Sequence, residues 1–137
     1  MKKILVVDDS STVRQQVGMA LQQAGYTVVE AGDGVEGLQM LEKGGISMVI
    51  CDVNMPRMSG LDMLENLKRD ARHANIPVVM LTAESGRENV LRIAKQGVRD
   101  YLVKPFKEDM IVERVGRIID LKPKGSAPVK QKRFDDP

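Results

Sequence analysis

The sequence predicts an α/β fold in which five strands alternate with five helices in a single domain. Two observations support this. Short runs of consecutive apolar residues recur along the chain, and such runs are typical of strands buried on both faces. Each run is followed by a segment whose apolar residues recur at helical spacing. Because each connection between strands is then a crossover helix, the sheet should be parallel, with helices on both faces.

Local sequence signals indicate the first strand, the start of the helix that follows it and the end of that helix. Residues 4–7 are four consecutive apolar residues. Ser10 and Ser11 are suitable N-caps for the helix that follows, and Gly25 is a typical helix terminator. Residues 26–30 are expected to form a short second strand.

Side-chain caps organise the next two helices. Asp33 lies in a Gly-Asp-Gly turn and should cap a helix that continues to about Lys43. Residues 48–51 are expected to form the third strand. Ser59 should then cap the third helix, with Asp62 in the capping-box position.

The rest of the chain continues the alternation. Residues 77–81 and 100–103 are expected to be the fourth and fifth strands. Between them, Ser85 should open a fourth helix that ends at Gly97. Residues 107–121 carry apolar side chains on one stripe and are expected to form the last helix.

Charge and composition divide the chain at about residue 121. The chain has 137 residues, enough for one domain with a substantial core. Its formal net charge of +2 comes from the C-terminal segment, because residues 122–137 carry +3 and residues 1–121 carry −1. We therefore expect a domain over residues 1–121 and a basic, flexible tail or linker over residues 122–137. The sequence leaves open whether this tail ends the protein or leads to an output domain.

Other features exclude some classes of protein. The first strand begins almost at once, and no apolar run approaches the ~18 residues of a membrane span, so we expect a cytoplasmic protein without a signal peptide. The single cysteine, Cys51, lies in an apolar strand and is interpreted as a buried hydrophobic residue. The single histidine, His73, is expected to be a solvated loop residue rather than a metal ligand.

Polar residues follow the expected strands at the edge where parallel sheets bind ligands. They are Asp8, Asp9, Asp52, Thr82 and Lys104. Three converging aspartates would repel one another and raise at least one pKa unless a cation joins them. Oxygen ligands with room for water favour Mg²⁺, and lysine and threonine suit phosphoryl oxygens. A carboxylate in this setting could attack phosphorus and become an acyl phosphate.

Four motifs contain these residues in order along most of the chain. They are Val-Val-Asp8-Asp9-Ser, Asp52-Val-Asn54-Met-Pro56-Arg-Met-Ser-Gly60, Leu-Thr82-Ala-Glu84 and Tyr101-Leu-Val-Lys104-Pro105-Phe106. Together they resemble the receiver domain of two-component response regulators, and within it the chemotaxis-type single-domain regulators. The resemblance implies a flavodoxin-like (βα)5 doubly wound sheet with strand order 2-1-3-4-5, of which a chemotaxis regulator is a known example.

The resemblance also implies roles for individual residues. Asp52 would be the phosphoacceptor, and Mg²⁺ would be held by Asp8, Asp9, Asp52 and the backbone carbonyl of Asn54. Thr82 and Lys104 would contact the phosphoryl group, and Tyr101 would rotate inward as part of the switch. The Lys104–Pro105 peptide bond would be cis. Asn54 and Glu84 would tune dephosphorylation, which we expect to be rapid.

The implied function is a phosphorylation-dependent signalling switch and not an enzyme with an external substrate. A sensor histidine kinase or phosphotransfer protein would supply the phosphoryl group. An effector protein would then bind the face formed by the fourth helix, the fifth strand and the last helix. The protein could be a monomer or a phosphorylation-dependent dimer, and the sequence names neither the kinase, the effector nor the pathway.

Two alternative functions belong to other classes of protein. The first is a Mg²⁺-dependent phosphatase with an aspartyl-phosphate intermediate, which usually has its second acid two residues after the nucleophile and a substrate cap. Here the first-strand acids are adjacent, and no insertion could form a cap. The second is nucleic-acid binding through the basic tail, where Phe134 is the one aromatic residue and no recognition helix is evident.

Overall fold

The computed structural model describes residues 2–83, 91 and 93–119 of the chain. The strands are β1 (Lys3–Val7), β2 (Thr27–Ala31), β3 (Met48–Asp52), β4 (Val78–Thr82) and β5 (Asp100–Val103). The helices are α1 (Ser11–Gln23), α2 (Gly34–Glu42), α3 (Gly60–Arg69) and α5 (Glu108–Ile119). Residues 93–95 are also helical.

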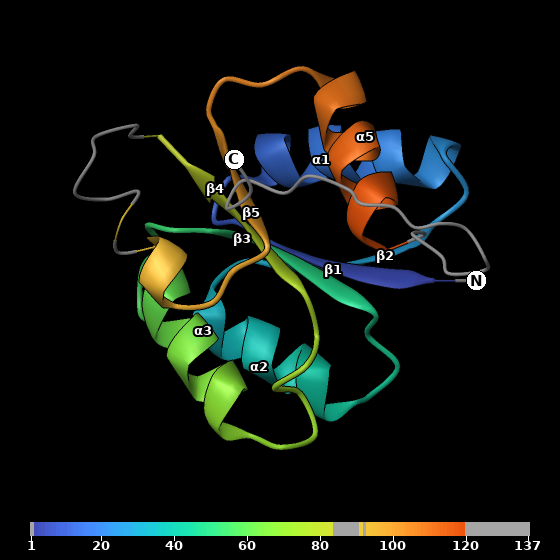
Figure 1. Cartoon of the computed structure of the whole chain (residues 1–137). Coiled ribbons are helices and arrows are strands. Elements are labelled where there is room, and N and C mark those ends of the chain that lie inside the picture. The colour runs from blue at the N-terminus through green and yellow to red at the C-terminus, as the bar shows by residue number, and fades with distance from the viewer. Residues whose placement is uncertain (1, 84–90, 92, 120–137) are drawn as a thin grey trace.

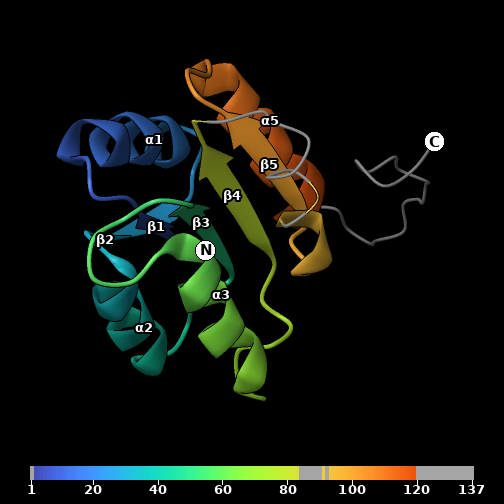
Figure 2. The ribbon, with the colours of Figure 1, turned by 90° about the vertical axis from the view of Figure 1, so that its left-hand side faces the viewer.

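The strands form one parallel sheet in the order β2-β1-β3-β4-β5 (Figure 2). This confirms the predicted fold class and strand order. The register aligns the carboxyl ends of the inner strands, since Val7 of β1 lies opposite Cys51 of β3, and Asp52 lies opposite Leu81 of β4. Residues that directly follow these strands therefore share one edge of the sheet.

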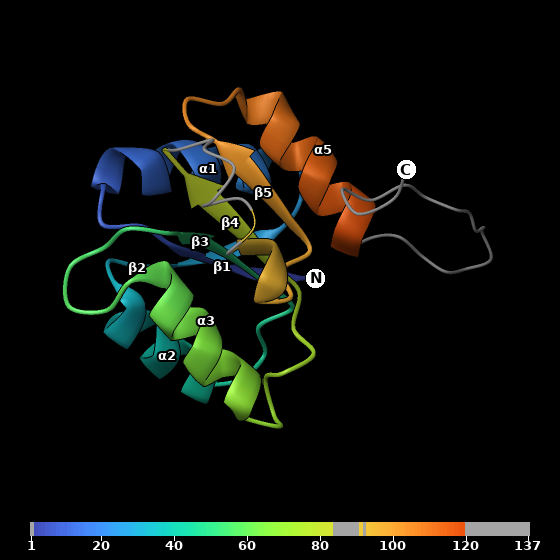
Figure 3. The same ribbon diagram turned by 60° about the vertical axis from the view of Figure 1, so that its left-hand side comes forward.

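Helices cover both faces of the sheet, with α1 and α5 on one side and α2 and α3 on the other (Figures 1 and 3). Successive residues of β1 point to opposite faces. Ile4 and Val6 pack in the core with α1 and α5, whereas Leu5 and Val7 pack in the core with α2 and α3. Because both faces are buried, the strand is apolar throughout instead of alternating.

Three predicted helix caps are confirmed. A side-chain oxygen of each cap accepts a hydrogen bond from a backbone N–H three residues later, which satisfies one of the helix's unpaired donors. The pairs are Ser10 with Val13 at 3.3 Å, Asp33 with Glu36 at 2.9 Å and Ser59 with Asp62 at 3.1 Å.

The interpretation of His73 as a solvated loop residue was wrong. Its exposed fraction is 8%, and its Nδ1 lies 3.6 Å from a carboxylate oxygen of Asp70. The segment after α3 folds back against the helix, where Lys68 donates a hydrogen bond to the carbonyl of Ala74. This return of the chain buries the imidazole.

Smaller differences concern element ends. Strand β2 lies one residue later than expected, and α5 begins one residue later. Most of the predicted fourth helix and the whole of the tail, residues 122–137, lie outside the described residues.

Cys51 is buried as predicted, and burial raises the pKa of its thiol. None of the helices within the described ranges has the length and apolar character needed to cross a membrane.

Candidate functional site

Three carboxylates meet at the carboxyl edge of the sheet. Asp8 and Asp9 directly follow β1, and Asp52 is the last residue of β3. Ligand oxygens of all three lie within 4.8 Å of one another. Asp8 and Asp52 are buried whereas Asp9 is exposed, so the cluster opens to solvent on the side of Asp9.

Lys104 brings a positive charge to the buried pair. It directly follows β5, and its Nζ lies 3.1 Å from Asp8 Oδ2 and 3.1 Å from Asp52 Oδ1. Because the Asp8 side chain is fully buried, this ammonium compensates charge that water cannot reach. The four side chains come from three strand ends that the sheet aligns.

The electrostatic environment of the cluster disfavours the ionised form of Asp52. Burial, followed by repulsion from Asp8, raises the pKa of Asp52, and the attraction of Lys104 offsets this only in part. Burial also works against the charged form of Lys104, but its bonds and attractions to Asp8 and Asp52 outweigh burial and raise the pKa of that ammonium. A further cation at the cluster would stabilise the ionised carboxylates.

Backbone contacts fix the loops that carry the acids. The N–H of Asp8 donates to the carbonyl of Ala31 at 3.1 Å, and Asp8 Oδ1 accepts from the N–H of Ser10 at 2.9 Å. After β3, the N–H of Gly60 donates to the carbonyl of Val53 at 2.7 Å. A Cβ on Gly60 would overlap the carbonyl oxygen of Asp52, so the loop closes this tightly only with glycine.

The remaining candidate residues are placed as follows. Thr82 ends β4 and is 2% exposed, and its carbonyl accepts from the N–H of Lys104 at 2.8 Å. Tyr101 is partly buried and packs against the core beneath α2 and α3. The Lys104–Pro105 peptide bond is cis. Asn54 is exposed in the loop after β3. Glu84 lies outside the described residues.

The donor set of the cluster suits a hard divalent cation. Three carboxylates offer oxygen ligands, and the exposed side at Asp9 leaves room for water. Mg²⁺ is usually bound by a few carboxylates together with water and phosphate oxygens. The residues present therefore fit Mg²⁺.

The sequence did not single out two arginines on loops and helices around the site, of which Arg14 contacts the site directly. Arg14 of α1 donates to the carbonyl of Asp8 at 2.6 Å, and Arg57, in the loop after β3, has a positive φ of 68° and lies 2.7 Å from Asp33. One signal was present for Arg14. A cation near the N-terminus of a helix is opposed by the helix dipole, so its occurrence there indicates a specific partner.

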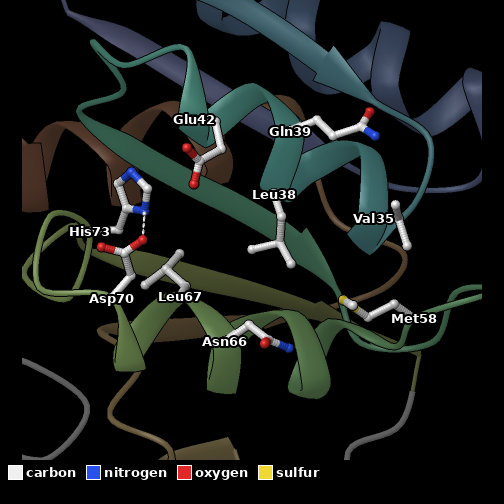
Figure 4. Close-up of a pocket in the computed structure, with 9 residues that line it drawn as sticks. All are labelled: Val35, Leu38, Gln39, Glu42, Met58, Asn66, Leu67, Asp70 and His73. Carbon is white, nitrogen blue, oxygen red and sulfur yellow. Dashed lines mark ion pairs between the residues drawn. The ribbon is translucent and has the colours of Figure 1, made fainter.

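A separate pocket of about 370 Å³ lies between α2 and α3 (Figure 4). Its floor is apolar and includes Leu38 and Leu67, while Glu42, Asp70 and His73 lie at one end. Arg72 bridges Glu42 and Asp70 with contacts of 2.7 and 2.6 Å. The lining residues do not include the aspartate cluster, so this pocket is not part of the candidate site.

Comparison with known proteins identifies the family. The profile of the response regulator receiver domain matches residues 4–116. The chain is 42% identical over 119 residues to chemotaxis protein CheY-3 of Vibrio cholerae, covering 86% of this chain and 92% of that protein. It is 40% identical to chemotaxis protein CheY of Pseudomonas aeruginosa, covering 86% and 96%. A solved structure of Vibrio cholerae CheY4 superposes with a TM-score of 0.82 at 36% identity, covering 86% and 98%. With this match added to the sheet order and the strand-edge aspartates, the chain belongs to the response regulator receiver domain family.

Proposed function

We propose that this receiver domain accepts a phosphoryl group on Asp52 from a histidine kinase or a phosphotransfer protein, and that phosphorylation changes the surface that binds an effector. The observation that carries the proposal is the approach of Lys104 to both Asp8 and Asp52 within a three-carboxylate cluster. Such a cluster is costly to the fold, because its charges are buried and crowded. A role in phosphoryl transfer explains why it is present.

Asp52 is the nucleophile in this proposal. Its carboxylate oxygen attacks phosphorus of the donor, the bond from phosphorus to the donor atom breaks, and an aspartyl phosphate results. Lys104 contributes in two ways, since it favours the ionised, nucleophilic form of Asp52 and then neutralises charge on the phosphoryl oxygens. The hydroxyl of Thr82 would donate a hydrogen bond to the same oxygens.

Asp8, Asp9 and Asp52, with the backbone carbonyl of Asn54, would hold Mg²⁺. When bound, the ion supplies positive charge that neutralises the phosphoryl oxygens and orients them for in-line attack. The aspartates of the first loop thus act by binding and orienting, whereas Asp52 alone forms the covalent bond.

The switch would operate through the residues beside Lys104. An aspartyl phosphate carries roughly two negative charges where the ionised Asp52 carried one, and the added charge would draw Thr82 and Lys104 toward Asp52 and let Tyr101 rotate inward. The effector would bind where the fourth helix, β5 and α5 meet, although most of the fourth helix lies outside the described residues. The similarity to chemotaxis proteins supports a pathway of that kind. In this proposal the domain acts in the cytoplasm, as a monomer or a phosphorylation-dependent dimer.

Two further parts of the proposal concern the lifetime of the aspartyl phosphate and the boundaries of the receiver domain. Asn54 and Glu84 would flank the phosphoryl group and admit water, giving rapid self-dephosphorylation. The receiver would span residues 1–121, with residues 122–137 as a basic tail. The end of the family match at residue 116 supports this boundary.

No observation favours the alternative functions. The family match covers the strands and helices that carry the site and gives no support to a Mg²⁺-dependent phosphatase. The basic tail lies outside the described residues, so nucleic-acid binding has only its composition in favour.

The proposal is tested by intact-mass spectrometry after incubation with acetyl phosphate and Mg²⁺. We expect one added phosphoryl group on the native chain and none on Asp52→Asn or in the presence of EDTA. Asp70→Asn is a matched control, because it removes a carboxylate remote from the cluster and should leave labelling intact. An unlabelled native chain beside a labelled control receiver would contradict the proposal.

A further inference from the structure

Arg14 connects three segments that end at the candidate site. Its Nη1 donates to the main-chain carbonyl of Asp8 at 2.6 Å, and its Nε donates to a carboxylate oxygen of Glu30 at 3.0 Å. The side chain is only 21% exposed. Arg14 lies on α1, Asp8 follows β1, and Glu30 lies near the end of β2. The guanidinium therefore ties a helix to the ends of two strands.

The bond to the Asp8 carbonyl fixes a particular peptide plane. That carbonyl belongs to the peptide unit joining Asp8 to Asp9, and a peptide unit is rigid and planar. The N–H of Asp8 donates to the carbonyl of Ala31 at 3.1 Å, which fixes the peptide unit before Asp8. The hydrogen bond from Arg14 fixes the peptide unit after Asp8. Rotation of the Asp8–Asp9 plane would change the direction in which the Asp9 carboxylate leaves the backbone.

Glu30 sets the direction of the guanidinium. Its carboxylate engages Nε, which leaves Nη1 aimed at the Asp8 carbonyl. Lysine could keep the charge but could not reproduce both bonds, because its ammonium lacks the rigid fork of arginine. Replacing Arg14 with lysine thus separates the effect of its hydrogen-bond geometry from the effect of its charge.

We infer that Arg14 is a positioning residue that holds the Asp8–Asp9 peptide in the orientation needed to bind Mg²⁺, with Glu30 orienting the guanidinium. The inference rests on the proposed function, in which Asp8 and Asp9 are metal ligands. Groups that orient metal ligands commonly change metal affinity by 10- to 100-fold when removed.

Charge alone predicts the opposite effect. Arg14 is a cation close to the carboxylate cluster, so its removal would make the site more negative and bind Mg²⁺ more tightly. A positioning role predicts weaker Mg²⁺ binding when Arg14 is removed, in spite of the more negative charge of the site. The sign of the change in affinity therefore distinguishes the two accounts.

The test is calorimetric titration of Mg²⁺ into the full chain, without a phosphoryl donor. We expect the Kd for Mg²⁺ to rise about tenfold in Arg14→Gln and to rise in Arg14→Lys as well. Glu30→Gln should weaken binding, but it should have little further effect once Arg14 is replaced, because the two act through one contact. Arg69→Gln removes an exposed arginine from α3 and should leave the Kd unchanged.

Urea unfolding of the same variants separates positioning from a merely structural role. If Arg14→Gln binds Mg²⁺ as tightly as the native chain, or more tightly, the inference is overturned even if the urea midpoint falls. Native Kd for Arg14→Lys would also overturn it, because charge would then suffice. A native chain that binds Mg²⁺ but is not phosphorylated would defeat the proposed function while leaving this inference intact. A native chain that binds no Mg²⁺ would overturn both.

Discussion

Replacing Asp52 with asparagine should stabilise the metal-free protein at neutral pH. Asp52 is 6% exposed, and its ligand oxygen lies within 4.8 Å of those of Asp8 and Asp9. At an effective dielectric constant of about 20, repulsion at 4.8 Å is about 3.5 kcal/mol from each of the two other carboxylates, and attraction to Lys104 at 3.1 Å is about 5 kcal/mol. Loss of hydration on burial adds a penalty of several kcal/mol per ion, so the unfavourable contributions exceed the attraction.

The raised pKa of Asp52 gives the sign of that balance. Each unit of increase means that ionisation costs the folded state about 1.4 kcal/mol. We therefore expect Asp52→Asn to raise the free energy of unfolding at pH 7, and each kcal/mol of such a gain would raise the Tm by about 4 °C for a domain of this size. Asp9→Asn is the matched control, because it removes the same charge at an exposed position and should raise the free energy of unfolding by less.

The pH dependence follows from proton linkage. Between the ordinary pKa of 3.8 and the raised folded value, the folded state binds more protons than the unfolded state. The stability of the native chain therefore falls as pH rises through this window, whereas the Asp52→Asn variant lacks this loss. The advantage of the variant should vanish below pH 3.8.

Thermal unfolding by circular dichroism, in EDTA and across this pH range, measures the difference. In saturating Mg²⁺ the native chain should gain stability by mass action, and the variant should gain less. A variant that is less stable than the native chain at neutral pH in EDTA would refute the reasoning. So would an advantage that persists unchanged into acid.

Other substitutions test the packing and charge around the site. Lys104→Ala should lower the free energy of unfolding by about 2 kcal/mol at pH 7 without Mg²⁺, a loss that disappears in acid as the carboxylates become protonated; equal urea midpoints at pH 7 would contradict this. Gly60→Ala should destabilise by about 3 kcal/mol or prevent folding, because its Cβ would overlap the Asp52 carbonyl. Gly116→Ala, where the added Cβ in α5 would meet only the Tyr26 hydroxyl at an ordinary contact distance of 3.9 Å, should stabilise by about 0.5 kcal/mol, and thermal unfolding compares the two. Arg114→Ala should cost about 2 kcal/mol in urea unfolding, because Asp100 is 7% exposed and loses a partner at 2.8 Å; an unchanged midpoint would show that the pair contributes little.

The fold was predictable because local signals and topology agree. Four consecutive apolar residues at Ile4–Val7 indicated a strand buried on both faces, and the caps Ser10, Asp33 and Ser59 indicated where helices begin. Alternation of strands and helices then required a parallel sheet. Strand order came from resemblance to a family, because crossover connections alone permit several orders.

The site was predictable only in part. Asp8, Asp52 and Lys104 could be brought together from the sequence because each lies at a strand end, and parallel strand ends share an edge. The helix position of Arg14 indicated that it has a partner, but the partners themselves could not be predicted, since these contacts depend on how α1 packs across β1 and β2. His73 was misjudged for a similar reason, because its burial depends on a loop returning to α3.

The most direct test of the central claim is to locate the phosphoryl group. The native chain would be phosphorylated with acetyl phosphate and Mg²⁺, reduced with borohydride to convert any aspartyl phosphate to homoserine, and mapped by peptide mass spectrometry. We predict homoserine at position 52 and intact aspartate at Asp8 and Asp9. Homoserine at Asp8 or Asp9, or at no aspartate of a chain that has gained a phosphoryl group, would contradict the account.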